Sequence, residues 1–447
     1  MSNKKIPVVP KELIVPFIAA TSIFALWGFA NDLTNPMVAA FKKVMVLSNK
    51  EAYNVQFAFY FGYGVMAIPA ALFIRRFSYK SGILLGLALY AIGAVLFYPA
   101  ALEESYTYFL ISLFVITCGL GFLETTSNPL ILSMGDASTA TQRLNLAQSF
   151  NPIGSLTGMM IAKFVVLDRI LSADYVDSTE IMALGADKAA EIRTHDLEVI
   201  STPYISVGIF VAIVFFIIWK TNIPKMFMGE HLTIKESLNK IFKSKTYLFG
   251  VIAQTFYVGA QIMCWTAIFQ LVEYINMGRG AEQVDGTFWN IGAMLLFVST
   301  RFIGTALMRK FNAASMLTVF TIAAVLLCAG VIVTNGITSL ICLVLVSVFM
   351  SIMFPTIYGL ALKDMGEEAK LASSGLIMAI VGGAFLPKIQ AAIMDIGETV
   401  NGEEVFGDVV IGGITEIHFS FILPLICLAV VGFYGIYAYR VTKQASH

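Results

Sequence analysis

The chain has 447 residues, of which 58% are hydrophobic and only 13% are charged, and its formal net charge is zero. A water-soluble globule of this length does not reach such an apolar content, so most of the chain is expected to lie in a lipid bilayer. No basic patch or tail indicates a nucleic-acid partner. The sequence also shows no metal-ligand run, phosphate-binding loop or nucleophile–base motif, so neither an enzyme nor a bound metal or cofactor is expected.

Twelve apolar stretches are long enough to cross a bilayer, because a helix needs roughly 20 residues to span the hydrocarbon. We expect spans at about 13–41, 52–74, 81–102, 107–134, 143–166, 203–220, 246–275, 286–308, 313–334, 337–362, 372–394 and 417–439. The sequence therefore predicts an all-α, multi-pass membrane protein.

Basic residues are distributed unevenly among the loops that these spans define. With both termini in the cytoplasm, the inner loops collect most of the Lys and Arg, and the outer loops 168–198 and 395–416 are rich in acids. This pattern follows the positive-inside rule, although Lys42, Lys43 and Lys50 then lie on the outer side. The N-terminal segment lacks the pattern of a cleaved signal peptide. We expect a protein of the cell (inner) membrane with cytoplasmic termini.

The midpoint of the chain is a long basic stretch that separates two sets of six spans. The segment IRRFSYKSG after the second span recurs as MRKFNAASM after the eighth, and Pro129 in the fourth span has a counterpart in Pro355 of the tenth. Equivalent features half a chain apart indicate a duplication. We predict the major facilitator architecture, with six-helix bundles at 1–220 and 246–447 joined by a cytoplasmic linker at 221–245. In that design the two halves are pseudo-symmetric, and substrate binds between them near the midplane.

Two acids, Asp32 and Glu124, lie inside otherwise apolar stretches. A charged side chain at the bilayer centre costs at least about 3 kcal/mol on insertion scales, so such acids usually face a polar cavity and serve protons, ions or substrate. Burial favours the protonated form of a carboxyl group, which would allow either acid to load a proton on one side and release it on the other. Both acids therefore predict a transporter, and we assign proton coupling to Asp32 and Glu124.

Amides and aromatic rings accompany these acids. Within single spans, three groups are expected to share a helical face: Asp32 with Asn35; Asn145 with Gln148 and Asn151; and Gln254 with Gln261 and Trp265. Amides can bracket hydroxyl groups, and flat rings such as Tyr257 and Trp265 suit the CH face of a sugar. We expect substrate contacts from Asn31, Asn35, Glu124, Gln148, Asn151, Tyr257, Gln261 and Trp265.

Six motifs in order along nearly the whole chain carry a family resemblance: FALWGFANDLTNP, FYFGYGVMAIPAAL, GLGFLETTSNP, RLNLAQSFN, YVGAQIMCW and FMSIMFPTIYGLALK. The chain resembles the fucose–galactose–glucose/proton symporter family of the major facilitators. The resemblance implies inward, proton-driven transport of a monosaccharide. It also implies that Glu124 takes part in sugar recognition and coupling, and that Gln148 and Asn151 contact the sugar.

The chain departs from that family at two positions. The family's fucose transporters read ANNLND in the first span with the proton-carrying aspartate last, whereas this chain reads ANDLTN. Asn35 thus occupies the place of that aspartate, and Asp32 lies one turn earlier on the same face. Phe354 stands where those transporters have tyrosine, which removes a hydroxyl group and leaves the identity of the sugar open.

The residues leave several functional alternatives. Asp32, Asn35, Glu124 and Thr125 could supply the oxygen ligands that a hard cation prefers, so sodium-coupled symport of a hexose or N-acetylhexosamine is the second hypothesis. A membrane receptor or an intramembrane enzyme is the third. We expect the protein to act as a monomer whose partners are a monosaccharide, protons and membrane lipid.

Some side chains also have structural interpretations. Glu124 could form an ion pair with Arg301, and Gln148 and Asn151 could make hydrogen bonds between helices. Arg301 could face the cavity or extend to the cytoplasmic surface. Lys388 within the eleventh span could point outward, pair with an acid or face the cavity.

Overall fold

The computed structural model describes residues 6–45, 47, 54–175, 178–221, 233–277, 283–394 and 410–444. Within these ranges, 11 helical runs are long and apolar enough to cross a membrane. The 23-residue helix α3 (Asn54–Arg76), some of whose side chains are not described, occupies the remaining predicted span. The all-α fold class is confirmed; β1 (Val410–Ile411) and β2 (Ile414–Thr415) form a two-stranded antiparallel hairpin beside it.

The first half of the chain contains, besides α3, the helices η1 (Lys11–Leu13), α1 (Ile14–Val44), α4 (Tyr79–Val95), α5 (Phe97–Leu102), α6 (Tyr106–Ser133), η2 (Ala137–Thr139), α7 (Ala140–Gln148), α8 (Asn151–Ile161), η3 (Ala162–Leu167), η4 (Leu171–Asp174), α9 (Ser178–Ala183) and α10 (Ala186–Lys220). Within this group α1 packs on α8, and α6 packs on α3 and α4.

The second half contains α11 (Ile234–Lys243), α12 (Lys245–Met277), α13 (Gly286–Leu307), α14 (Ala313–Val333), α15 (Ile337–Met350), α16 (Met353–Ala361), η5 (Gly366–Glu368), α17 (Ala369–Met378), η6 (Ala379–Val381), α18 (Gly382–Met394), α19 (Glu416–Phe419) and α20 (Ile422–Gln444). Here α12 packs on α18 and α20, and α14 packs on α15 and α20.

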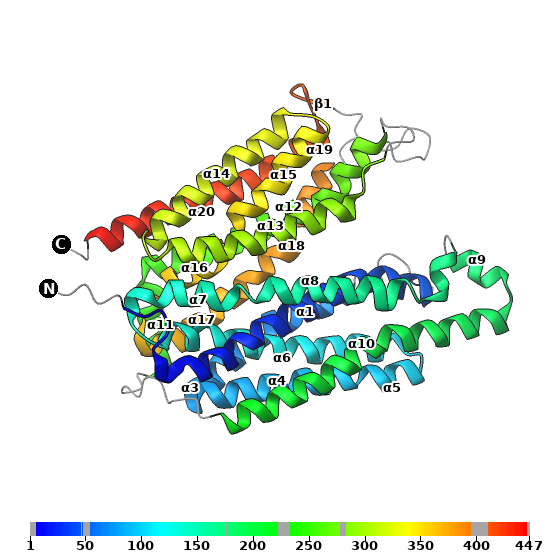
Figure 1. Ribbon diagram of the computed structural model, residues 1–447, viewed down its shortest axis with the longest axis horizontal. Coiled ribbons are helices and arrows are strands. Elements are labelled where there is room, and N and C mark those ends of the chain that lie inside the picture. The colour runs from blue at the N-terminus through cyan, green and yellow to red at the C-terminus, as the bar shows by residue number, and fades with distance from the viewer. Residues whose placement is uncertain are drawn as a thin grey trace.

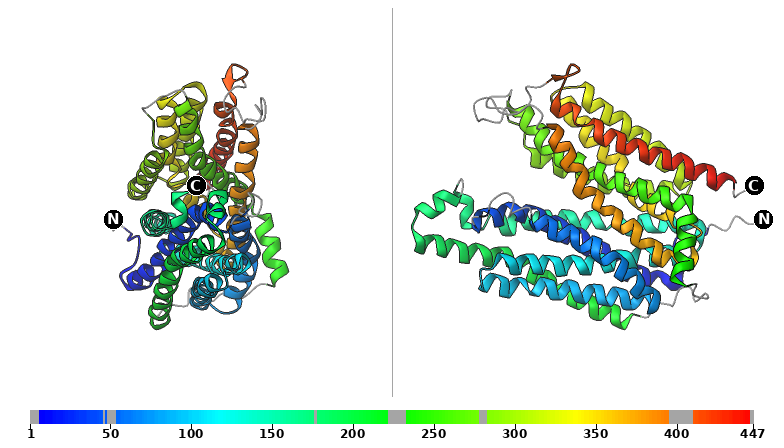
Figure 2. Two further views of the ribbon diagram at one scale, coloured as in Figure 1. Left: turned by 90° about the vertical axis from the view of Figure 1, so that its right-hand side faces the viewer. Right: turned by 180° about the vertical axis from the view of Figure 1, so that it is seen from behind.

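The two groups of helices converge at the end of the molecule where both termini lie and diverge toward the opposite end (Figure 1). The view from behind shows the same arrangement (Figure 2). Contacts between the groups come from α7 against α16, α17 against α3 and α6, and α13 against α7 and α8. The two halves are therefore packed together on the terminal side.

Glycines allow the helices of the first half to approach backbone to backbone. A Cβ atom on Gly154 of α8 would lie 1.8 Å from the carbonyl oxygen of Ala25, and one on Gly28 of α1 would lie 2.1 Å from that of Asn151. Neither contact is possible for a residue with a side chain, so the α1–α8 packing depends on these glycines. This packing places the middle of α1 beside the start of α8.

Proline interrupts two of the predicted spans. The expected helix at 143–166 breaks after Gln148, and the expected helix at 337–362 breaks after Met350. Because proline has no N–H, Pro152 cannot bond the carbonyl of Gln148, and Pro355 cannot bond that of Ser351, four residues earlier in each case. Each break leaves a backbone acceptor at bilayer depth that needs another donor.

Arg143 is fully buried at the terminal side of the first half. Its Nε donates to the carbonyl of Ile131 at 2.7 Å, and its Nη atoms donate to those of Leu132 at 2.6 Å and Val8 at 3.0 Å. Gly135 has φ +140°, and a Cβ there would lie 2.9 Å from Nη1 of Arg143. The guanidinium therefore joins the end of α6, the start of the chain and α7.

Candidate functional site

Glu124 lies in the middle of α6 with only 3% of its surface exposed. Neither carboxylate oxygen has a hydrogen-bond partner among the residues that the structure describes. No salt bridge in the described part of the chain involves it, so the suggested ion pair with Arg301 is not formed. A buried carboxyl group without a counter-charge is costly when ionised, which makes proton uptake the natural way to neutralise it.

A chain of amides connects the Glu124 segment to α7. Asn128 Nδ2 donates to the carbonyl of Glu124 at 3.0 Å, and Gln148 Nε2 donates to Asn128 Oδ1 at 2.7 Å. Gln148 thus makes the interhelical hydrogen bond that its structural interpretation predicted, while its own amide oxygen is left for other donors.

The polar face of α1 lies beside aromatic side chains from both halves. Trp27 Nε1 donates to the hydroxyl of Tyr63, and the ring of Trp27 lies 6.5 Å from that of Phe354 in α16. Asn31 and Asp32, one turn further along α1, are half-buried. The side chain of Asn35 lies outside the described residues, so its predicted contact has no structural account.

The second half contributes aromatic rings and amides from α12. Tyr257 donates to the carbonyl of Met350 at 3.0 Å, and its ring lies 6.3 Å from that of Phe354. Trp265 Nε1 donates to Ser347 Oγ at 3.1 Å. Gln261 and Trp265 are half-buried, whereas Gln254 is fully buried. The predicted face of α12 is therefore partly accessible near its middle.

Arg301 of α13 is buried and joins the two helix breaks. Its Nε donates to the carbonyl of Ser351 at 2.5 Å, and its Nη1 donates to that of Gln148 at 2.9 Å. The guanidinium carbon lies 4.5 Å from the centre of the Phe297 ring. The alternative that Arg301 extends to the cytoplasmic surface is wrong, because its side chain ends at carbonyls inside the molecule.

The structure brings Glu124, Gln148 and Tyr257 toward the zone where the halves meet. Asn151 instead donates to the carbonyl of Phe24 in α1 at 3.2 Å, as its structural interpretation predicted. The sequence analysis gave no role to Trp27. Its position four residues before Asn31, on the same helical face, was the signal that could have found it. The sequence also suggested Glu124 as a partner of Arg301, whereas the structure pairs Arg301 with the carbonyls of Ser351 and Gln148, which Pro355 and Pro152 leave free.

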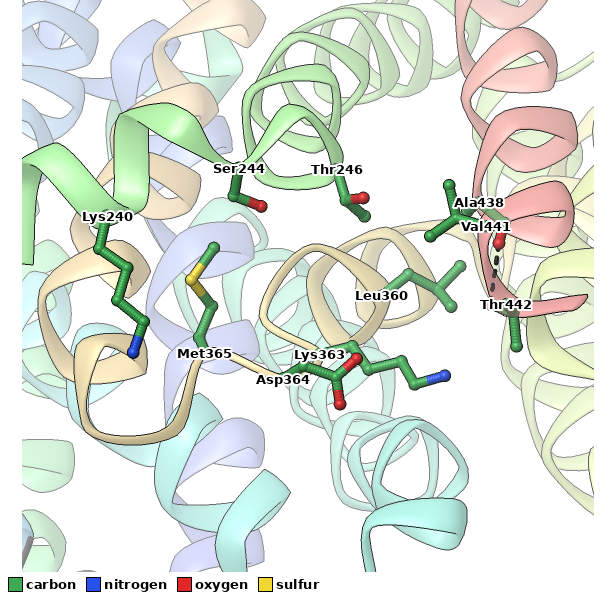
Figure 3. A pocket seen from close by; sticks show the side chains of 10 residues that line it. All are labelled: Lys240, Ser244, Thr246, Leu360, Lys363, Asp364, Met365, Ala438, Val441 and Thr442. Carbon is green, nitrogen blue, oxygen red and sulfur yellow. Dashed lines mark hydrogen bonds between the residues drawn. The ribbon is translucent and has the colours of Figure 1, made fainter. Parts of the chain in front are cut away.

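A separate pocket of about 230 Å³ lies between α11, α12, α16 and α20 (Figure 3). It is lined by Lys240, Ser244, Thr246, Leu360, Lys363, Asp364, Met365, Ala438, Val441 and Thr442. None of the predicted substrate contacts lines it. Lys388 is exposed on α18 and also lies outside both regions.

Two helical halves that meet around a buried acid and amides define a polytopic membrane carrier. The Major Facilitator Superfamily model matches residues 17–387, so the chain belongs to that superfamily. It is 50% identical to the L-fucose-proton symporter of Haemophilus influenzae over 98% of this chain and 99% of that protein. It is 33% identical to the L-fucose-proton symporter of Escherichia coli, covering 94% and 92%, respectively.

A solved structure agrees with these sequence relationships. The chain matches the crystal structure of FucP, a major facilitator transporter in the outward conformation, with a TM-score of 0.82 and 31% identity. The match covers 96% of this chain and 99% of that one. The glucose/galactose transporter of Brucella abortus is 29% identical, covering 93% of this chain and 92% of its own length. The predicted membership of the major facilitators is confirmed.

Proposed function

We propose that this protein is a secondary active transporter that imports a monosaccharide, L-fucose or a related hexose, together with protons. The observation that carries this proposal is the buried Glu124 carboxyl group, which has no partner among the described residues. It lies in a chain whose relatives at 50% and 33% identity are named L-fucose-proton symporters. A transporter of this class moves its substrate without covalent chemistry and is not an enzyme.

Proton coupling is assigned to Asp32 and Glu124. A buried acid can cross the membrane field neutral and release its proton once it meets water on the other side. Substrate contacts are assigned to Asn31, Asn35, Glu124, Gln148, Asn151, Tyr257, Gln261 and Trp265. Half-burial of Asn31, Gln261 and Trp265 supports their access to a ligand between the halves.

Transport is proposed to proceed by rocking of residues 1–220 against residues 246–447, with residues 221–245 as the linker. Convergence of the halves on the terminal side supports a state that is closed there and open at the other end (Figure 1). The distribution of Lys and Arg supports a cytoplasmic position for that side. The protein is proposed to act as a monomer in the cell (inner) membrane.

The sodium-coupled alternative has no comparable support. The relatives reported above whose names include a coupling ion name the proton. The receptor and enzyme hypotheses lose their support with membership of a transporter superfamily.

Uptake into proteoliposomes tests the proposal. Radiolabelled L-fucose, D-galactose, D-glucose, D-mannose and N-acetylglucosamine are offered with an inward proton gradient imposed or absent, in sodium-free buffer. We expect gradient-driven accumulation of one sugar, abolished by a protonophore. Accumulation that appears only when sodium is added at clamped pH would reject proton coupling, and movement of no sugar would reject the substrate class.

A further inference from the structure

Backbone carbonyls released by proline lie at the contacts between the two halves. Pro129, Pro152 and Pro355 each lack the N–H that would bond the residue four positions earlier. Each released carbonyl accepts a hydrogen bond from a side chain, which for Thr125 and Gln148 comes from the opposite half. The acceptors are Thr125, Gln148 and Ser351.

Arg301 uses two of these carbonyls, one in each half. Its Nε–Ser351 bond, at 2.5 Å, stays within the second half, and its Nη1–Gln148 bond, at 2.9 Å, crosses to the first. The carbonyl ends of α7 and α15 carry partial negative charge, which favours a cation there. The planar guanidinium can donate to both carbonyls at once, which the point charge of a lysine cannot do with the same geometry.

Neighbouring contacts tie the same side together. Ser373 Oγ of α17 donates to the released carbonyl of Thr125 in α6 at 3.2 Å. Asn145 Nδ2 of α7 donates to Thr356 Oγ1 of α16 at 3.1 Å. Among these contacts only Arg301 supplies a charge, and hydrogen bonds from charged donors are roughly twice as strong as neutral ones.

We propose that Arg301 holds the terminal side closed by donating to the proline-released carbonyls of Gln148 and Ser351, and that the Gln148 bond breaks each time this side opens. The inference deepens the alternating-access mechanism proposed above and adds a conformational role for a residue outside the sugar contacts. Pro152 and Pro355 are then required because they keep the two acceptors free.

Spin-label distances across the closed side test this role without any sugar. The full chain carries Ala137→Cys and Lys310→Cys, which are exposed near the ends of α6 and α13 on opposite halves. In the otherwise unchanged chain we expect one dominant short distance. Arg301→Lys and Arg301→Gln should shift the open-to-closed ratio by roughly ten- to a hundredfold, since a charged hydrogen bond contributes about 1.5–3 kcal/mol.

Proline variants separate the released carbonyls from a general effect on folding. Pro152→Ala restores an N–H that competes for the Gln148 carbonyl, so we expect a smaller shift in the same direction. Pro203→Ala, in α10 away from the contacts between the halves, is the matched control. Folded Arg301→Lys and Arg301→Gln variants with unchanged distances would overturn the proposal, as would equal shifts in Pro152→Ala and Pro203→Ala. Sugar uptake is measured separately, so failure of the proposed substrate leaves this result intact.

A second and independent observation concerns α11, which lies across the terminal end of the molecule rather than along the spans (Figure 2). Ile234, Leu238 and Phe242, at i, i+4 and i+8, form one stripe and are 52%, 38% and 61% exposed. Ser237 and Ile241 on the adjoining face are buried against the protein. A stripe of this kind is an unpartnered apolar face on a helix perpendicular to the spans.

Lysines border this stripe. Lys235 and Lys243 are exposed on α11, while Lys240 pairs with the buried Glu368 at 2.7 Å and fixes the helix to η5 of the second half. An apolar stripe flanked by lysines is the pattern of helices that lie in the headgroup region of an anionic membrane. The capping box formed by Thr233 and Glu236 supports the helix without lipid.

We infer that α11 lies on the bilayer surface at the terminal side, with Ile234, Leu238 and Phe242 among acyl chains and Lys235 and Lys243 at anionic headgroups. Because the described contacts of α11 are with α12, α17 and Glu368, this anchor would fix the second half to the membrane surface. The first half would then be the half that moves relative to the lipid.

Accessibility of a nitroxide label tests the anchor in proteoliposomes containing phosphatidylglycerol. Leu238→Cys is compared with Asn239→Cys, its exposed neighbour on the polar face, and with the unsubstituted chain as a background for the native cysteines. We expect the label at 238 to be relaxed by oxygen and the label at 239 by a water-soluble nickel chelate. The double variant Lys235→Gln, Lys243→Gln should lower the relaxation of the label at 238 by oxygen, because each lost lysine weakens the attraction to anionic headgroups roughly fivefold. If the nickel chelate relaxed the labels at 238 and 239 equally, the inference would be overturned. It would also be overturned if the shielding of the label at 238 from nickel increased with protein concentration, because a second copy of the chain would then cover the stripe.

Discussion

The two halves present different chemistry to each other. Both halves contribute amides and aromatic rings, but the two acids, Glu124 and Asp32, belong to the first half, whereas the buried cation Arg301 belongs to the second. Acids bind and release protons, while rings and a fixed guanidinium cannot at physiological pH. This difference supports the proposals that proton coupling belongs to the first half and that Arg301 of the second half holds the terminal side closed.

The largest effect is expected at Glu124. Glu124→Gln keeps the shape of the side chain but cannot release a proton, so we expect concentrative uptake to disappear. One proton moving through 100 mV yields about 2.3 kcal/mol, which supports a sugar ratio of roughly fifty. The measured ratio in proteoliposomes should fall to one. A variant that still accumulates sugar against a gradient would remove Glu124 from the coupling step.

Substitution of Asp32 tests whether sugar exchange and proton coupling in the first half depend on different residues. Asp32→Asn should retain exchange of sugar across the membrane but lose its dependence on the proton gradient, because the amide cannot titrate. Counterflow and gradient-driven uptake are measured on the same preparation. Exchange with a normal pH response would show that the acid has a structural role only.

The acids and spans could be predicted because each depends on local composition. Glu124 and Asp32 stand out in any apolar stretch of span length, and all twelve stretches follow from hydropathy. The break after Gln148 was not predicted, although Pro152 is visible in the sequence, because proline is often tolerated within membrane helices. Proline alone does not say whether a helix bends, breaks or continues.

Long-range partners could not be predicted at all. Arg301 donates to residues 153 and 50 positions away, and Arg143 reaches Val8 at a separation of 135. Such contacts depend on how distant segments pack together, and the spacing of residues along one helix carries no information about that packing. Asn151 shows the same limit, since its bond to the carbonyl of Phe24 depends on the close α1–α8 packing through glycine.

A smaller effect is expected at Phe354, the ring that contacts Trp27 from one half and Tyr257 from the other. Phe354→Tyr adds a hydroxyl group to a side chain that is only 6% exposed. If that hydroxyl meets the sugar, we expect the KM for L-fucose relative to D-glucose to change several-fold with unchanged thermal stability.

The control for this variant is Phe320→Tyr, on α14 in contact with Phe349. It should leave the relative KM values unchanged. A buried hydroxyl without a partner costs about 1–3 kcal/mol. A lower melting temperature of Phe354→Tyr without a change in sugar preference would therefore mean that the new hydroxyl group is buried without a partner and does not contact the sugar.

The smallest effect is expected in the loop between α6 and α7, on the terminal side of the first half. Asp136 there accepts hydrogen bonds from Ser138 Oγ at 2.5 Å and from the Ser138 N–H at 2.8 Å. These bonds, the hydroxyl first, hold the pKa of the Asp136 carboxyl below its usual value. A lowered pKa stabilises the folded state above the unfolded value, and this contribution is lost as the pH falls through the folded value.

Ser138→Ala should therefore raise the pKa of Asp136 toward its usual value by removing the hydroxyl bond, while the backbone N–H of residue 138 still donates to the carboxyl group. The thermal midpoint, measured from neutral pH through an acidic series, should be slightly lower than in the unsubstituted protein at neutral pH, and the difference should disappear as the pH falls below the folded pKa of Asp136. Ser206→Ala is the matched control, because its hydroxyl donates within α10 and contacts no acid. The corresponding loop of the second half instead pairs its acids with lysines, Glu368 with Lys240 and Glu367 with Lys370. If the thermal midpoints of Ser138→Ala and of the unsubstituted protein are the same at every pH, the Ser138 bond to Asp136 adds no stability. The contrast between the halves would then be confined to their buried surfaces.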